Sequence, residues 1–474
     1  MTRVLTALLG FSALTAPAAA AEPTVAELQR QIDELKAMVQ ELKAAQRGTA
    51  AAPPVTAAAP PATAAPARAV AAAPPAPAVQ HAAADVPSPK GKAWYERLTL
   101  RGYTQMRLNA IVSGDRTAPA GVSRLRSVQD SGITDQNNFS LRRVRLVLQG
   151  DLGDNVSLYL QPDFATVVNN QSANERREGF GQLRDAYVDL HWGQDDEFRL
   201  RFGQSKVPFG WENLQSSSNR LALDRTDAIN SATPGERDLG IVAYYTPAHV
   251  SRIWKRLDKS GQKLFGNYGA FGLALYNGQG IARTETNNNL MTVAMATWPF
   301  ELDGLGSAFA GQVVEIGGSA MLNKYQPELR SGGVSATSFD DNRVVVHAML
   351  YPQPFGIQAE WTWGRGPEFD QPTNRIATKS LNGGYIQSMF RVKHSPLGAF
   401  MPFARWQYYR GGWKSGLNAP RLETDEIEFG VEFQPIKPLE LTLSYSHMKR
   451  READERRSGQ AEGDLIRAQV QFNY

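Results

Sequence analysis

Between residues 139 and 209 the sequence alternates apolar and charged side chains along four short runs. The first run places Arg143 and Arg145 on one face and apolar residues on the other, and the fourth repeats the pattern with Arg199 and Arg201. A period of two with unlike faces predicts β-strands that separate two different solvents. In a lipid bilayer, strands need a closed barrel to pair their backbone, with apolar side chains facing lipid and charged ones facing a water-filled lumen.

The same alternation continues to the end of the sequence and predicts an all-β transmembrane barrel of sixteen antiparallel strands within residues 90–474. Connections are predicted to be short after even-numbered strands and long and polar after odd-numbered ones, as at 205–236 and 366–382, a pattern typical of periplasmic turns and outer loops. The insertion 247–266 breaks this order and predicts a basic protrusion on the periplasmic side. The strands are expected to begin near residues 99, 139, 154, 182, 197, 237, 267, 290, 307, 342, 355, 383, 399, 424, 439 and 464.

The first 89 residues differ in composition from the barrel region and predict three further modules. Residues 1–21 have a positive start, a short apolar core and an Ala-rich cleavage site, as in export signal peptides. Apolar residues in 22–46 recur at spacings of three and four, which predicts a periplasmic coiled-coil helix or, alternatively, a lone amphipathic helix on a surface. Residues 47–89 are rich in Ala and Pro and predict an extended linker.

Catalytic, metal and nucleic-acid functions find no support in the sequence. The chain has no cysteine, and its six histidines are scattered without metal-ligand spacing. No cofactor-binding motif precedes a predicted helix, so we expect neither an enzyme nor a cofactor. The net charge is only +4, and the mixed charges of 449–457 indicate a solvated outer loop rather than a nucleic-acid site.

The last predicted strand alternates apolar and polar residues and ends on Tyr474. A terminal strand that ends on an aromatic residue is similar to the signal read by the outer-membrane barrel assembly machinery. The sequence therefore predicts a location in the outer membrane of a Gram-negative cell, with the lipid bilayer and this machinery as partners.

Several motifs together resemble the phosphate-selective porin family, which includes porins O and P. They are LRRVRLVLQGDL, LRDAYVDLHW, LRFGQSKVPFGWE, LDRTDAINSATPGERDLGIVAY and FARWQYYRGG. The resemblance covers roughly residues 95–474 and implies a homotrimer of sixteen-stranded barrels. It also implies that the third surface loop, here 205–236, folds inward, and that an arginine ladder leads anions to a central site.

The resemblance carries over to individual residues. Arg142 and Arg143 match a pair of arginines on the second strand, and strand parity places Arg143 in the lumen and Arg142 on the other face. Ser218 and Arg220 match the central hydroxyl and basic residue, although the family usually has lysine in place of Arg220. The predicted anion-binding residues are Arg107, Arg142, Arg143, Arg145, Asp185, Arg199, Arg201, Ser218, Arg220, Arg225, Arg391 and Arg405.

Arginine suits an anion pore because it stays protonated and offers a planar fork of donors that matches phosphate or carboxylate oxygens. Many shallow sites along a wall favour conduction, since a permeating ion must also be released. The leading hypothesis is a passive anion-selective porin for phosphate, pyrophosphate or polyphosphate. Two alternatives stay open: a porin for organic anions such as dicarboxylates, and an envelope tether in which 22–46 reaches peptidoglycan or a periplasmic partner.

Overall fold

The computed structural model describes residues 93–114, 125, 130, 132–133, 137–167, 178–393, 395–396, 398–456 and 459–474. The predicted signal peptide, coiled-coil helix and linker, residues 1–89, lie outside the described residues. Within these residues no helix has the length and apolar character needed to cross a membrane.

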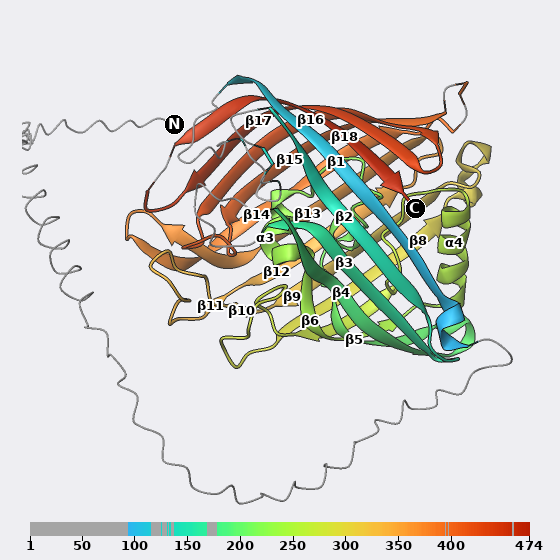
Figure 1. Cartoon of the computed structure of the whole chain (residues 1–474), viewed down its shortest axis with the longest axis horizontal. Coiled ribbons are helices and arrows are strands. Elements are labelled where there is room, and N and C mark those ends of the chain that lie inside the picture. The colour runs from blue at the N-terminus through green and yellow to red at the C-terminus, as the bar shows by residue number, and fades with distance from the viewer. Residues whose placement is uncertain are drawn as a thin grey trace, which may run out of the picture. The chain divides into compact units, whose positions relative to one another are not determined.

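Sixteen antiparallel strands form a closed barrel, in agreement with the prediction from the sequence (Figure 1). Each strand pairs with its neighbours around the ring, and β1 pairs with β18 to close it. The barrel strands are β1 (Leu98–Gly114), β2 (Asn138–Asp151), β3 (Val156–Val167), β4 (Glu178–Trp192), β5 (Phe198–Lys206), β6 (Arg237–Tyr245), β7 (Phe271–Tyr276), β8 (Met291–Glu301), β9 (Val313–Leu322), β12 (Asn342–Leu350), β13 (Phe355–Asp370), β14 (Arg375–Phe390), β15 (Ala399–Gly412), β16 (Arg421–Ile436), β17 (Leu439–Ala453) and β18 (Gln460–Asn473).

The two faces of the strands differ as the alternation predicts. On β5 the Arg201 side chain is fully buried inside the barrel, whereas Phe202 on the outer face is 39% exposed. On β2 Val147 is buried, while Phe139 is 71% exposed. Large apolar side chains left open to solvent on the outside of a closed sheet are the surface that lipid chains cover in an outer-membrane barrel.

Two connections differ from their predicted form. The loop predicted at 366–382 is mostly strand, because β13 and β14 continue to pair as far as Asp370 and Arg375. The connection between β9 and β12 also contains secondary structure: two short strands, β10 (Lys324–Tyr325) and β11 (Phe339–Asp340), pair there as a two-stranded ribbon. The remaining short elements are single turns of 3-10 helix: η1 (Trp94–Arg97), η3 (Gln194–Asp196), η4 (Pro234–Glu236), η5 (Asp303–Leu305) and η6 (Ser307–Phe309).

Two β-bulges change the direction of charged side chains. On β2, Arg143 pairs with Gln105 but the next paired residue is Leu141, so Arg142 is an extra residue. Arg142 then lies on the lumen side, 3.3 Å from Asp224, and its predicted placement on the other face is wrong. The in–out alternation of side chains fails at this point because, in a β-bulge, two residues of one strand lie opposite a single residue of its neighbour. Both side chains of the bulge then point inward. An equivalent shift on β4 makes Arg184 the extra residue beside Asp185.

Residues 207–236, here called the inner segment, lie inside the barrel. They include α2 (Trp211–Leu214) and α3 (Asp227–Ala232), and α3 is seen within the ring of strands near β13 and β14 (Figure 1). Most of their side chains are buried. The inner segment bonds to strands on several sides of the barrel: Ser217 to Tyr103 of β1, Trp211 to Glu360 of β13, Ser231 to Arg343 of β12, Asp227 to Arg450 of β17 and Asp224 to Arg467 of β18.

The insertion 247–266 is not the predicted protrusion. It contains α4 (Ala248–Lys259), which lies at the end of the barrel that carries the short turns, next to β8 (Figure 1). One face of α4, formed by Val250, Ile253 and Leu257, is buried because these residues follow helical spacing. Trp254 Nε1 donates to Glu315 on the inner face of β9 at 2.9 Å, so the helix is fastened to the barrel interior.

Candidate functional site

The centre of the candidate site is the carboxylate of Glu236, the last residue of the inner segment. Glu236 is buried, and five basic side chains from β4, β5, β6 and the inner segment surround it. The nitrogen–oxygen distances are 3.9 Å for Arg184, 3.8 Å for Lys206, 3.5 Å for Arg220 and 3.3 Å for Arg225, and Arg237 Nη1 donates to the same carboxylate. We call these six residues the Glu236 cluster.

Local sequence explains how the Glu236 cluster is assembled. The bulge on β4 turns Arg184 inward next to Asp185, and Arg184 Nη2 donates to the Gly235 carbonyl at 2.7 Å. Lys206 ends β5 and donates to two carbonyls of the inner segment, those of Asn213 at 2.9 Å and Gln215 at 2.7 Å. Basic groups from the wall and from the inner segment therefore meet where this segment joins β6.

Asp185 holds one of these cations in place. Arg237 donates to the Asp185 carboxylate through Nε at 3.0 Å and through Nη2 at 2.8 Å. Arg237 Nη2 also bonds to Gln161 at 3.2 Å. Asp185 therefore orients the guanidinium group of Arg237.

A second group of charges surrounds Asp224 in the middle of the inner segment. Arg107 contacts Asp224 at 3.0 Å, Arg142 at 3.3 Å and Arg467 at 2.7 Å. Arg107 also contacts Asp130, at 2.5 Å. These arginines lie in the lumen, but carboxylates already neutralise much of their charge.

Arg143 differs from its neighbours. It is 4% exposed, and Nη1 donates to Gln105 at 2.7 Å. Among the described residues no carboxylate forms an ion pair with Arg143, and its Nε is buried without a hydrogen-bond partner. Gln105 in turn donates to the Ser217 carbonyl of the inner segment at 3.0 Å. Arg143 is thus a buried cation beside the inner segment with donor capacity left over.

The structure places the other predicted residues at separate points of the lumen. Ser218 shares a hydrogen bond with Ser216 at 2.8 Å. Arg391 lies at the turn end, where it donates to the Ser260 carbonyl that follows α4 at 2.9 Å. The other four arginines pair with acids: Arg145 with Asp163 at 2.7 Å, Arg199 and Arg201 with Asp189 at 3.7 and 2.7 Å, and Arg405 with Glu212 at 2.8 Å.

A cavity of about 600 Å³ adjoins the Glu236 cluster on the side of the short turns. Its wall is formed by β1 to β6, the inner segment and residues 265–268. Basic and hydroxyl side chains predominate among its polar lining: Arg97, Arg101, Arg145, Lys206, Arg237, Tyr159, Tyr187, Tyr268, Ser216, Ser217 and Ser218. Three carboxylates, those of Asp151, Asp185 and Asp189, also line it. We call this cavity the vestibule, and its volume lies in the range of small-molecule sites.

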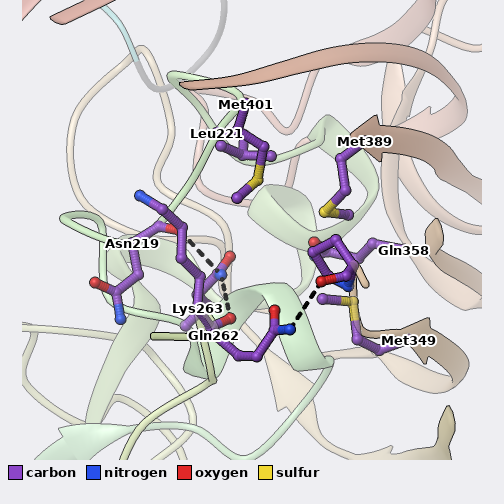
Figure 2. A pocket seen from close by; sticks show the side chains of 10 residues that line it. Asn219, Leu221, Gln262, Lys263, Met349, Gln358, Met389 and Met401 are labelled. Atoms are coloured by element: carbon purple, nitrogen blue, oxygen red, sulfur yellow. Dashed lines mark hydrogen bonds between the residues drawn. The ribbon is translucent and has the colours of Figure 1, made fainter. Parts of the chain in front are cut away.

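On the side of β12 to β15, the inner segment packs closely against the barrel wall at one point. Met349, Met389 and Met401 from the barrel wall approach Leu221 of the inner segment and Gln262, and the gap between them holds about 10 Å³, room for about one water (Figure 2). Gln262 fixes this packing by donating to the Pro352 carbonyl at 2.9 Å. At this point the packing leaves far less room beside the inner segment than the vestibule does.

Lys263 fastens the residues that follow α4. Its Nζ lies 2.7 Å from Glu432 and 3.3 Å from Glu440 on adjacent strands. Burial alone would lower the pKa of Lys263, but the two carboxylates outweigh it and raise the pKa above its usual value. The ammonium therefore stays charged at neutral pH and holds the segment against the wall.

Sequence reasoning identified Arg220, Arg225 and Asp185 but missed Arg184, Lys206, Glu236 and Arg237 as members of one cluster. Glu236 and Arg237 belong to the PGERDLG part of the motif LDRTDAINSATPGERDLGIVAY. A consecutive charged pair in an alternating strand, as in Arg184 and Asp185, is the signal that would have indicated a bulge. No group of three acidic or histidine side chains suited to a metal ion is found in the described part of the chain.

Comparison with known proteins agrees with this architecture. A family model described as phosphate-selective porin O and P matches residues 119–474. No curated protein sequence matches the chain. The fold is similar to the outer membrane channel DcaP of Acinetobacter baumannii, with 14% identity and a TM-score of 0.50 over 80% of this chain and 97% of that one. The anion-selective porin from Comamonas acidovorans aligns with 13% identity and a TM-score of 0.45 over 80% of this chain and 99% of that one.

Proposed function

Because the chain belongs to the phosphate-selective porin O and P family, we propose that it is a passive, anion-selective channel for phosphate, pyrophosphate or polyphosphate. As a porin barrel it resides in the outer membrane. The observation that carries the proposal is the convergence of five basic side chains on Glu236, inside the barrel and next to the vestibule. Such a density of buried cations favours an oxyanion over a cation of similar size.

The electrostatics support passage rather than tight capture. Fixed charges act more strongly in a narrow, water-poor space than in bulk water. Most lumen arginines also contact a carboxylate, as Arg107 contacts Asp224 and Arg145 contacts Asp163. Because its charge is partly neutralised by a carboxylate, each of these arginines binds a permeating anion only weakly. Conduction requires weak binding sites from which the ion can leave.

We infer that the anion passes on the vestibule side of the inner segment. Arg101 and Arg97 lie at the turn end of this space, Arg145 and Arg237 lie deeper, and Arg143 lies near Ser217. Towards β12 to β15, the packing leaves room for about one water beside Leu221. A path lined by guanidinium and hydroxyl groups supplies both charge and directed hydrogen bonds to an oxyanion.

Planar-bilayer recording of the purified full-length protein tests the proposal. In a potassium chloride gradient the reversal potential should indicate chloride preference, and added inorganic phosphate should reduce the chloride current in a concentration-dependent way. A reversal potential of the opposite sign, or the absence of any phosphate block, would contradict the proposed function.

Organic dianions are a second candidate because of the size and lining of the vestibule. Its volume of about 600 Å³ exceeds the need of a single phosphate, and the stacked rings of Tyr159 and Tyr187 give it an apolar part. Measuring block of chloride current by phosphate and by a dicarboxylate such as succinate at equal charge separates the two candidates. Stronger block by the dicarboxylate would favour the second.

We also propose that the barrels assemble as homotrimers, as the family resemblance implies. Unheated samples in mild detergent should then migrate as a species of three chains, and heating should convert it to the monomer. Chemical cross-linking that stops at dimers would contradict this assembly.

A further inference from the structure

Glu236 is the only member of the Glu236 cluster that carries negative charge, and its backbone is held in an unusual conformation. Gly235 has φ +66° and Glu236 has φ +75°, so two consecutive residues adopt the left-handed region. This conformation costs a glutamate of the order of 1 kcal/mol relative to ordinary backbone. Its ion pairs offset that cost and keep the carboxylate directed into the cluster.

The two carboxylate oxygens divide the cations between them. Oε1 faces Arg220 and Arg225, while Oε2 faces Arg184, Lys206 and Arg237. Asp185 neutralises part of Arg237, so five cations face two acids. Buried like charges repel and are costly to desolvate, so this site would be strongly unfavourable without Glu236 or another anion.

Three guanidinium nitrogens in the cluster still have donor capacity. Arg184 Nε, Arg220 Nε and Arg225 Nη2 are buried and make no hydrogen bond within the part of the chain that the structure describes. Buried N–H groups are rarely left without an acceptor, and each such group in a folded protein calls for an explanation. An oxyanion with several acceptor oxygens is a ligand that would satisfy donors of this kind.

We propose that Glu236 is a tethered counter-ion that competes with the permeating oxyanion for these five cations. This inference rests on the proposed anion-channel function and concerns how the same site releases its ion. An arriving oxyanion contacts Lys206 and Arg237, the two members of the Glu236 cluster that line the vestibule, and takes over part of the charge that Glu236 neutralises. When the ion leaves, the carboxylate neutralises the cations again, so the residue lowers affinity and shortens the bound time.

The variant Glu236→Gln removes the competing charge with little change in shape. In bilayers containing the full-length protein, the phosphate concentration that halves the chloride current should fall by about tenfold, because affinity rises when an anionic competitor is removed. Individual blocking events should lengthen by a similar factor. Glu236→Asp keeps the charge on a shorter side chain, reaches the cations less well, and should shift the half-blocking concentration in the same direction by a smaller factor.

Glu368→Gln is the matched control. Glu368 is also buried and pairs with two basic residues, Arg421 at 2.9 Å and Lys379 at 3.7 Å, but it lies outside the Glu236 cluster. The variant Glu368→Gln removes the same charge from the barrel as Glu236→Gln and should leave the half-blocking phosphate concentration unchanged. An equal shift in the control would attribute the effect to overall charge and overturn the inference.

Two results distinguish the possible failures. If Glu236→Gln keeps chloride preference but its half-blocking concentration is unchanged or higher, Glu236 only supports the inner segment, and the inference is wrong while the proposed function stands. If the wild-type channel shows no phosphate block, the proposed function fails first. Should Glu236→Gln not yield the folded, heat-modifiable barrel, Glu236→Asp decides alone, and an unchanged half-blocking concentration in that variant overturns the inference.

Discussion

At the scale of single residues, the arginines of the lumen fall into two classes. Arg107 and Arg201 contact carboxylates at 2.5 and 2.7 Å and are fully buried, so they contribute to the fold. Arg143 has one side-chain hydrogen bond, to Gln105, but, among the described residues, no ion pair. A cation whose charge is not already neutralised is the stronger candidate for contact with a permeating anion.

Arg143→Ala should weaken phosphate block and leave the barrel folded. A hydrogen bond from a charged donor contributes about 1.5–3 kcal/mol, so the half-blocking phosphate concentration should rise by about tenfold or more. Arg107→Ala serves as the contrast, because it leaves Asp130 and Asp224 buried with weaker neutralisation and should destabilise the barrel by about 3–5 kcal/mol. Thermal unfolding in detergent and bilayer recording measure the two effects, and wild-type phosphate affinity in Arg143→Ala would rule out the contact.

At the scale of elements, the bulges on β2 and β4 explain where sequence parity fails. Alternation correctly predicted the outward Phe202, which lies in a regular stretch of strand, and the inward Arg143, which stays in register with Arg145 on the side away from Arg142. It failed at Arg142, since a bulge depends on the register with the neighbouring strand and not on the sequence of one strand alone. Consecutive charged residues in an otherwise alternating strand deserve to be tested as bulges.

Deleting Arg142 should remove the bulge without turning any other side chain. With Arg142 absent, Leu141 directly precedes Arg143 and the two side chains alternate regularly, so the outer face keeps its apolar residues. The variant that lacks Arg142 should form a heat-modifiable barrel, and phosphate should block its chloride current less strongly. Deleting Leu146, in a regular part of the same strand, should reverse the faces of one flank and abolish folding; equal folding of both deletions would contradict this account.

The helix α4 is an element that the sequence did not place. Its apolar residues at 250, 253 and 257 have helical spacing, but nothing in the sequence indicates that this face covers the end of the barrel. The partners of Trp254 and Lys263 lie on β9, β16 and β17, far away in the sequence. Contacts of this kind depend on the closed barrel and are not contained in local patterns.

Removing residues 248–260 should widen the turn end of the lumen. Trp254 occupies space beside Glu315, so the loss of α4 should raise the single-channel conductance. Anion preference should persist because the Glu236 cluster is not part of this segment. The milder variant Trp254→Ala should move conductance the same way, and unchanged conductance in both would show that α4 does not restrict the path.

At the scale of the whole molecule, the sequence predicted the fold well and the site only in part. Sixteen strands, their order and their faces follow from a repeated local pattern, which is why they were predictable. The Glu236 cluster joins residues between 184 and 237 through a segment that folds inside the barrel. Which acid meets which base there depends on the course of the inner segment, and alternation contains no information about it.

Deleting residues 22–89 should leave conductance and anion preference unchanged, because the strands that form the lumen begin at Leu98. If the predicted coiled coil tethers the barrel to peptidoglycan or a periplasmic partner, the deletion should make the envelope leak periplasmic proteins and become sensitive to detergent. Bilayer recording and a leakage assay on the same variant separate the two roles. An intact envelope in the deletion strain would remove support for the tether.

The carboxylates that accompany the arginines have a consequence for biogenesis. A barrel whose interior held only cations would need its cargo, or some other anion, to fold at all. This chain supplies its own negative groups, among them Asp224 and Glu236 on a single stretch of backbone. Its interior is thus neutralised before any permeating anion arrives, and, on the proposed function, such a channel can mature in surroundings where phosphate is scarce.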